Sequence, residues 1–134
     1  MASKELQAAL DAAQAAAEVI RSLYQKNITV KTKSDASPVT EADVRAEEVI
    51  KGILSERFPT YGFYGEETGK HSMGAENIWL VDPIDGTKSF VRDCPFFSTQ
   101  IALMRAGQIV VGVSSAPAYG ELAWAESCAF PGTT

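Results

Sequence analysis

The stretch NIWLVDPIDGTKSF, residues 77–90, decides how the rest of the chain is interpreted. Its apolar first half predicts a buried strand over 77–81, which delivers Asp82 at its carboxyl end, and we expect Pro83 to turn the chain there. Asp85 follows three residues after Asp82. Two carboxylates this close repel each other unless a cation lies between them, and Mg²⁺ prefers such oxygens. The stretch therefore predicts a strand that ends in a divalent-cation site, although a plain Asp-rich turn with Asp82 as a helix cap is the alternative.

The residues after Asp85 are suited to a phosphate group. Gly86 lets the backbone approach a ligand closely, and Thr87 supplies a hydroxyl group. With Lys88 and Ser89, Thr87 can open a short helix whose free amides would hold a phosphate oxygen.

A second acidic pair, Glu66 and Glu67, follows another short predicted strand, at 61–64. A Glu-Glu pair in a loop is usually solvated surface, but together with Asp82 and Asp85 it places four carboxylates in loops that follow strands. Asp43 lies three residues after Thr40, which the sequence predicts to be a helix N-cap. From the residues alone, Asp43 is interpreted as a capping acid.

The remaining pattern predicts an α+β layered domain of two helices and a mostly antiparallel sheet. Apolar residues at three- and four-residue steps predict a helix over 4–25, and a second helix runs from Thr40 to Pro59. Residues 28–38 are a strand or an extended loop, and 68–76 a polar loop that holds His71. The other predicted strands are 98–104 and 108–114, paired as a hairpin around Ala106 and Gly107, and 121–126.

Composition narrows the function further. The chain has 134 residues, a formal net charge of −5 and 46% hydrophobic residues, as in globular proteins. An acidic chain lacks the basic face of a non-specific nucleic-acid binder, and no apolar run is long enough for a membrane span. The N-terminus has no secretory pattern, and the two cysteines, Cys94 and Cys128, form no disulfide framework. We expect a cytoplasmic protein with neither nucleic-acid nor membrane partners.

Three blocks in order, KSDASPVTEAD (33–43), GEE (65–67) and DPIDGTKSF (82–90), resemble the inositol monophosphatase superfamily of Mg²⁺-dependent, Li⁺-sensitive phosphomonoesterases. The resemblance implies a layered α/β sandwich of the sugar-phosphatase type, of which residues 1–134 would be the N-terminal metal-binding portion. It also implies two or three Mg²⁺ ions, a small phosphorylated metabolite as substrate, and a homodimer. Family members continue into a C-terminal layer with a W-D-x-A-A-like block, which this sequence does not contain.

The resemblance also implies a role for each matched residue. Glu66, Asp82, the backbone carbonyl of Ile84, and Asp85 would bind metal. Gly86, Thr87 and Lys33 would bind the substrate phosphate, with Lys31 close enough to compete for the last role. Thr87, linked to Asp43, would help Glu66 to position and deprotonate the attacking water, and Glu67 would support a ligand or bind a third metal.

The branch of the family is inferred from smaller features. DPIDGTKSF and the later G-V to P-x-x-G-E stretch (112–121) are similar to histidinol-phosphatases, which favours histidinol phosphate, followed by inositol monophosphate and then a 3'(2'),5'-bisphosphate nucleotide. Without the W-D-x-A-A-like block, we expect this chain alone to have weak or no phosphatase activity. The competing hypothesis is a catalytically weak or inactive paralogue that binds metal or a partner.

Overall fold

The computed structural model describes residues 3–24, 30–32, 38–92 and 94–127, and for residues 30–32 and 38–39 the backbone only. The elements in chain order are α1 (Lys4–Leu23), β1 (Val30–Thr32), β2 (Pro38–Thr40), α2 (Glu41–Arg57), β3 (Gly62–Gly65), β4 (Gly69–His71), β5 (Asn77–Asp85), α3 (Thr87–Val91), β6 (Ser98–Arg105), β7 (Gln108–Ala116) and β8 (Glu121–Glu126). The predicted order of helices and strands is confirmed except for β4, which lies in a segment predicted to be a loop.

The main sheet has six strands in the order β4-β3-β5-β6-β7-β8. All neighbours are antiparallel except β3 and β5, which run parallel. Two parallel neighbouring strands need a connection that leads the chain back to the starting edge. Between β3 and β5, this connection is β4, which pairs with β3 at the edge of the sheet, together with the turn after β4. The prediction of a mostly antiparallel sheet is therefore confirmed, and its one parallel pair is the pair that carries both acidic loops.

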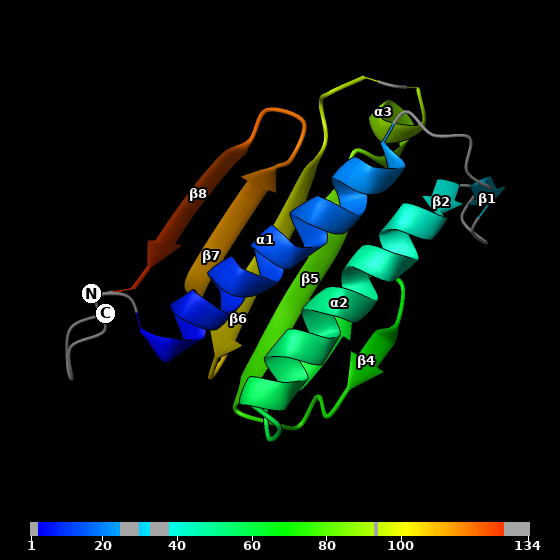
Figure 1. Cartoon of the computed structure of the whole chain (residues 1–134). Helices are drawn as coiled ribbons and strands as arrows, with labels where there is room; N and C mark the ends of the chain where they lie inside the picture. Colours follow the sequence, from blue (N-terminus) through cyan, green and yellow to red (C-terminus); the bar gives the residue numbers. More distant parts are fainter. Residues whose placement is uncertain (1–2, 25–29, 33–37, 93, 128–134) are drawn as a thin grey trace.

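The two long helices lie side by side over one face of this sheet (Figure 1). Alanines line the buried side of α1, and their small side chains let the helix approach both α2 and strands β6 and β7 closely. Helix α2 begins with the predicted cap: the Thr40 hydroxyl accepts from the Asp43 amide at 3.3 Å, and the Asp43 carboxylate accepts from the Thr40 amide at 2.8 Å.

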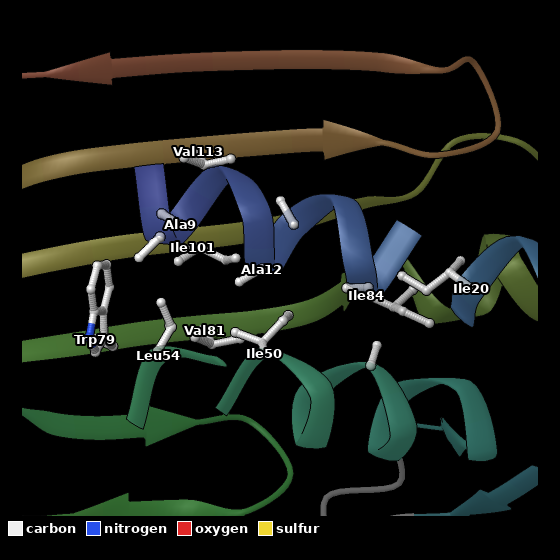
Figure 2. Packing of buried hydrophobic residues seen from close by; sticks show 14 of the residues in the cluster. Ala9, Ala12, Ile20, Ile50, Leu54, Trp79, Val81, Ile84, Ile101 and Val113 are labelled. Carbon is white, nitrogen blue, oxygen red and sulfur yellow. The ribbon is translucent and has the colours of Figure 1, made fainter. Parts of the chain in front are cut away.

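The hydrophobic core fills the space between these helices and the sheet. Figure 2 shows Ile50 and Leu54 of α2 and Ala9 and Ala12 of α1 facing Trp79, Val81, Ile101 and Val113 of the strands. Ile84 also joins this core. Burial of this apolar surface is the main force that holds the layers together.

Two local predictions were wrong. The segment 68–76, expected to be a loop, contains β4, which pairs with β3 through Phe63 opposite His71. Pro83 does not turn the chain, because β5 continues to Asp85 with a register shift between Asp82 and Asp85. The extra residue is accommodated as a β-bulge, where proline is tolerated since one ladder position is unpaired.

No described helix is both long enough and apolar enough to cross a membrane.

Candidate functional site

Glu66, directly after β3, and Asp82, within β5, lie side by side where the pairing of the two strands ends. These strands are parallel, with Gly65 opposite Val81, and the Glu66 amide donates to the Val81 carbonyl at 3.2 Å. Both acids line a cavity of about 720 Å³ on the face of the sheet away from the helices. Parallel pairing thus brings together two loops separated by fifteen residues of chain.

The bulge in β5 turns Asp85 to the same side of the sheet as Asp82. Asp82 lies opposite Gln100 and Asp85 opposite Ser98, so three steps on β5 match two on β6. Gln100 and Ser98 share a side, since the Gln100 amide donates to the Ser98 hydroxyl at 2.7 Å. In an unbulged strand, residues three apart would point to opposite faces. Asp85 lines a second, neighbouring cavity of about 400 Å³ together with Gly86.

Thr87 joins the end of β5 to the start of α2. Its hydroxyl lies 3.0 Å from Asp43 Oδ1 and 3.0 Å from the Ile84 carbonyl oxygen, so its one proton is shared between two acceptors. Asp43 Oδ2 accepts from the Thr40 amide and hydroxyl, which fixes the carboxylate. Asp43, interpreted from the residues alone as a capping acid, therefore caps α2 and also contacts Thr87.

Gly86 has a backbone that only glycine adopts easily. Its φ is +98°, and a Cβ there would lie 2.8 Å from the Phe96 carbonyl oxygen. The absence of a side chain lets the chain leave β5 and enter α3 beside the segment that precedes β6.

The acidic residues predicted for the site differ in their exposure to solvent. Glu66 and Asp85 are exposed, while Asp82 and Glu67 are half-buried. Within residues 3–24, 30–32, 38–92 and 94–127, no three His, Cys, Asp or Glu side chains are grouped so that they could hold a metal ion together. The five predicted acids (Asp43, Glu66, Glu67, Asp82 and Asp85) thus lie in one region of the molecule, but no three of them form a group that could hold a metal ion together. Lys33, Lys31 and Cys128 lie outside the residues whose side chains are described, and His71 and Cys94 are exposed.

The donors present still fit Mg²⁺. A magnesium ion keeps several waters and is bound through one or two carboxylates together with substrate phosphate oxygens. Glu66 and Asp82 offer hard oxygens on one cavity wall. The Ile84 carbonyl, which accepts from Thr87, keeps a second lone pair.

Glu47 of α2 was missed by the sequence analysis. Its side chain is fully buried, and its two carboxylate oxygens accept from the amides of Glu67, at 2.9 Å, and Thr68. An acid between Ala46 and Ile50, on the buried side of a helix, was the available signal, because an unpaired charge is not left in a core.

The profile of the inositol monophosphatase family matches residues 1–129. The chain belongs to this family. A histidinol-phosphatase of Chlorobaculum parvum is 42% identical over 123 residues, which cover 91% of this chain and 48% of that protein. An inositol-1-monophosphatase of Mesorhizobium japonicum is 42% identical over 115 residues, covering 81% and 43%.

Solved structures of the inositol monophosphatase family agree with the fold. The extragenic suppressor protein suhB from Bartonella henselae superposes with a TM-score of 0.90 at 35% identity, covering 94% of this chain and 50% of that one. The IMPase of Thermotoga maritima gives a TM-score of 0.87 at 28% identity, covering 94% and 49%. The chain spans about half the length of these relatives.

Proposed function

We propose that the protein is a Mg²⁺-dependent phosphomonoester hydrolase. The observation that carries the proposal is the placement of Glu66 beside Asp82, where the parallel pairing of β3 with β5 ends at one cavity. Membership of a family whose similar relatives are named phosphatases supports the same chemistry.

In this proposal Glu66, Asp82, Asp85 and the Ile84 carbonyl hold two or three Mg²⁺ ions. Bound Mg²⁺ neutralises the phosphate and lowers the pKa of a coordinated water. Glu67 supports these ligands from the adjoining loop or binds the third ion. The carboxylates also orient the water for in-line attack on phosphorus.

In this proposal Thr87 and Asp43 take up the proton of the attacking water. Thr87 Oγ1 accepts a proton from the attacking water while its own proton passes to Asp43 Oδ1, which it already contacts at 3.0 Å. The amides of Gly86 and Thr87, together with Lys33, bind the phosphate oxygens and keep the phosphorus in line with the water.

For the substrate we propose histidinol phosphate first and inositol monophosphate second. The Lys88-Ser89-Phe90 sequence after Thr87 and the Gly112–Glu121 stretch favour histidinol phosphate, and several similar relatives are named histidinol-phosphatases.

We further propose that the protein is cytoplasmic and forms a homodimer. Light scattering of the purified chain checks the dimer.

The test measures phosphate release with and without Mg²⁺ from histidinol phosphate, inositol 1-phosphate and a 3',5'-bisphosphate nucleotide. We expect slow Mg²⁺-dependent release from this chain alone, fastest with histidinol phosphate, and its loss in Asp82→Asn. Equal rates on all three substrates would remove the substrate proposal.

Mg²⁺ binding without release would favour the alternative, a metal-binding paralogue that does no chemistry. Calorimetric titration of the same protein sample with Mg²⁺ distinguishes this outcome from a protein that binds no metal.

A further inference from the structure

One buried carboxylate holds the acidic loop that follows β3. Glu47 has no exposed surface, and its Oε1 accepts from the Glu67 amide at 2.9 Å while its Oε2 accepts from the Thr68 amide. Hydrogen bonds from N–H groups to a carboxylate are stronger than those to neutral acceptors, which offsets the cost of burying the charge. Two successive peptide planes after Glu66 are thereby fixed.

Glu66 is consequently held from both sides. Its own amide donates to Val81 on β5, and the next two amides donate to Glu47 on α2. The Glu66 side chain itself is exposed. These three hydrogen bonds thus fix the backbone on both sides of Glu66, from which its side chain reaches the cavity that Asp82 also lines.

Helix α2 contacts both segments that carry the predicted site residues, each through one carboxylate. Asp43 and Glu47 are four residues apart, so they lie one turn apart on one side of the helix. Asp43 contacts Thr87 after β5, and Glu47 contacts the loop after β3. One turn of α2 thus sets the spacing of both loops.

Gly65 leaves room for this carboxylate. A Cβ at Gly65 would overlap the Glu47 carboxylate, while φ at Gly65 lies outside the left-handed region. The glycine is needed for space at this position, and a methyl group there would displace the flexible end of Glu47 with the backbone kept in an ordinary conformation.

We propose that Glu47 is a positioning residue, which acts through the Glu67 and Thr68 amides to aim Glu66 at the cavity that it shares with Asp82. This inference rests on the proposed function for the metal role of Glu66. Residues that orient metal ligands from outside change metal affinity by about 10- to 100-fold when they are replaced.

The test compares Glu47→Gln with Glu48→Gln, which removes the same charge from an exposed position on the same helix. Glutamine keeps the size of the side chain but offers one acceptor oxygen, with an amide group in place of the other. Two readouts are taken: amide hydrogen exchange at Glu67 and Thr68 without metal, and the Kd for Mg²⁺ by calorimetry. We expect E47Q to raise the exchange rates and the Kd about tenfold, and E48Q to change neither.

Gly65→Ala supplies a second variant in which the charge of Glu47 is retained, and it also covers the case in which E47Q does not fold. We expect it to raise the same exchange rates and the same Kd. If both variants fold and bind Mg²⁺ as tightly as the parent, with Thr68 still protected, the positioning role is overturned.

A parent protein that binds no Mg²⁺ would contradict the proposed function, and the exchange data would then decide the inference alone. Protection at Glu67 and Thr68 that disappears in both variants supports the positioning role. Fast exchange at these amides in the parent overturns it.

Discussion

The exit from β5 depends on one backbone angle, that of Gly86. Its φ of +98° is costly for any other residue, and the Phe96 carbonyl occupies the space that a Cβ would need. This turn sets the positions of the Gly86 amide and the Thr87 hydroxyl, which follow Asp85. The residue with no side chain therefore determines where these two polar groups lie.

We predict that Gly86→Ala lowers the free energy of unfolding by about 2–4 kcal/mol, the sum of the φ cost and the steric overlap. Gly107→Ala is the matched control, because Gly107 also has a positive φ of +82° but nothing lies within 4 Å of its Cβ position. It should lose only about 1–2 kcal/mol. Equal losses in urea denaturation would show that the Phe96 contact is unimportant.

Thr87 contributes its hydroxyl group. In Thr87→Val the shape is kept but the contacts to Asp43 Oδ1 and the Ile84 carbonyl, both at 3.0 Å, are removed. If the proposed proton transfer holds, we expect kcat for phosphate release to fall by about 10²-fold or more. Thr87→Ser keeps the hydroxyl and should stay within about tenfold of the parent. A serine variant as impaired as the valine variant would contradict a role for the oxygen.

At the scale of elements, the bulge in β5 connects the core to the site. Val81 and Ile84 both face the helices, which requires the extra residue between them, and the same residue turns Asp82 and Asp85 to the opposite face. The Thr99 hydroxyl of β6, fully buried, donates to the Pro83 carbonyl at 2.8 Å and fixes the bulge. A proline that sequence rules assign to a turn is thus held inside a strand.

We predict that Thr99→Val destabilises the protein by about 1–3 kcal/mol, since the Pro83 carbonyl loses its partner in the interior. Thr99→Ser keeps the hydrogen bond and loses one methyl group, which should cost about 1 kcal/mol. Thermal unfolding of the two variants checks the order. A serine variant less stable than the valine variant would mean that packing, not the hydrogen bond, holds the bulge.

Local pattern was sufficient to predict the helices, the β6–β7 hairpin and β8, because each has its own periodicity or turn residues. It failed at β4, a three-residue strand of Gly, Lys and His that exists only because β3 offers an edge. It failed at Pro83, where pairing with β6 outweighs the local preference of proline for a turn. The acids proposed as metal ligands were selected because the sequence predicts strands before them, whereas Glu47 was missed because its partners are backbone amides twenty and twenty-one residues away.

On the scale of the whole molecule, the two faces of the sheet carry different kinds of residue. The face covered by α1 and α2 (Figure 1) carries the apolar core, whereas Glu66 and Asp82 line the cavity on the opposite face and the bulge turns Asp85 to the same side. Substitutions on one face should thus change stability, and those on the other face should change the site. The exceptions are Asp43 and Glu47, which lie on the core side and reach the loops at the end of the sheet.

A second long-range connection lies on the helix side, away from the site, and it supplies a pH-dependent test of the packing of α1. Glu5 Oε2 accepts from the Tyr61 hydroxyl and from Arg105, each at 2.9 Å, which joins the start of α1 to the end of β6. Burial alone would raise the pKa of Glu5, but these hydrogen bonds and the charge of Arg105 outweigh it and hold the pKa below 4.5. Burial and the bond to Glu5 also raise the pKa of Tyr61.

The lowered pKa of Glu5 sets the sign of the pH dependence of stability. Since the folded state binds the Glu5 proton more weakly than the unfolded state, the stabilisation is complete above about pH 4.5 and is lost as pH falls through the folded pKa. Glu5→Gln should therefore cost about 1 kcal/mol at pH 7, and progressively less as pH falls through the lowered pKa of Glu5. Asp11→Asn tests the more exposed pair with Arg57, which also lowers the pKa of its acid, and should cost less than about 0.5 kcal/mol at pH 7. Chemical denaturation at several pH values measures both. A Glu5→Gln penalty that persists unchanged as pH falls would mean that the variant loses packing at the start of α1 and not a charged hydrogen bond between distant parts of the chain.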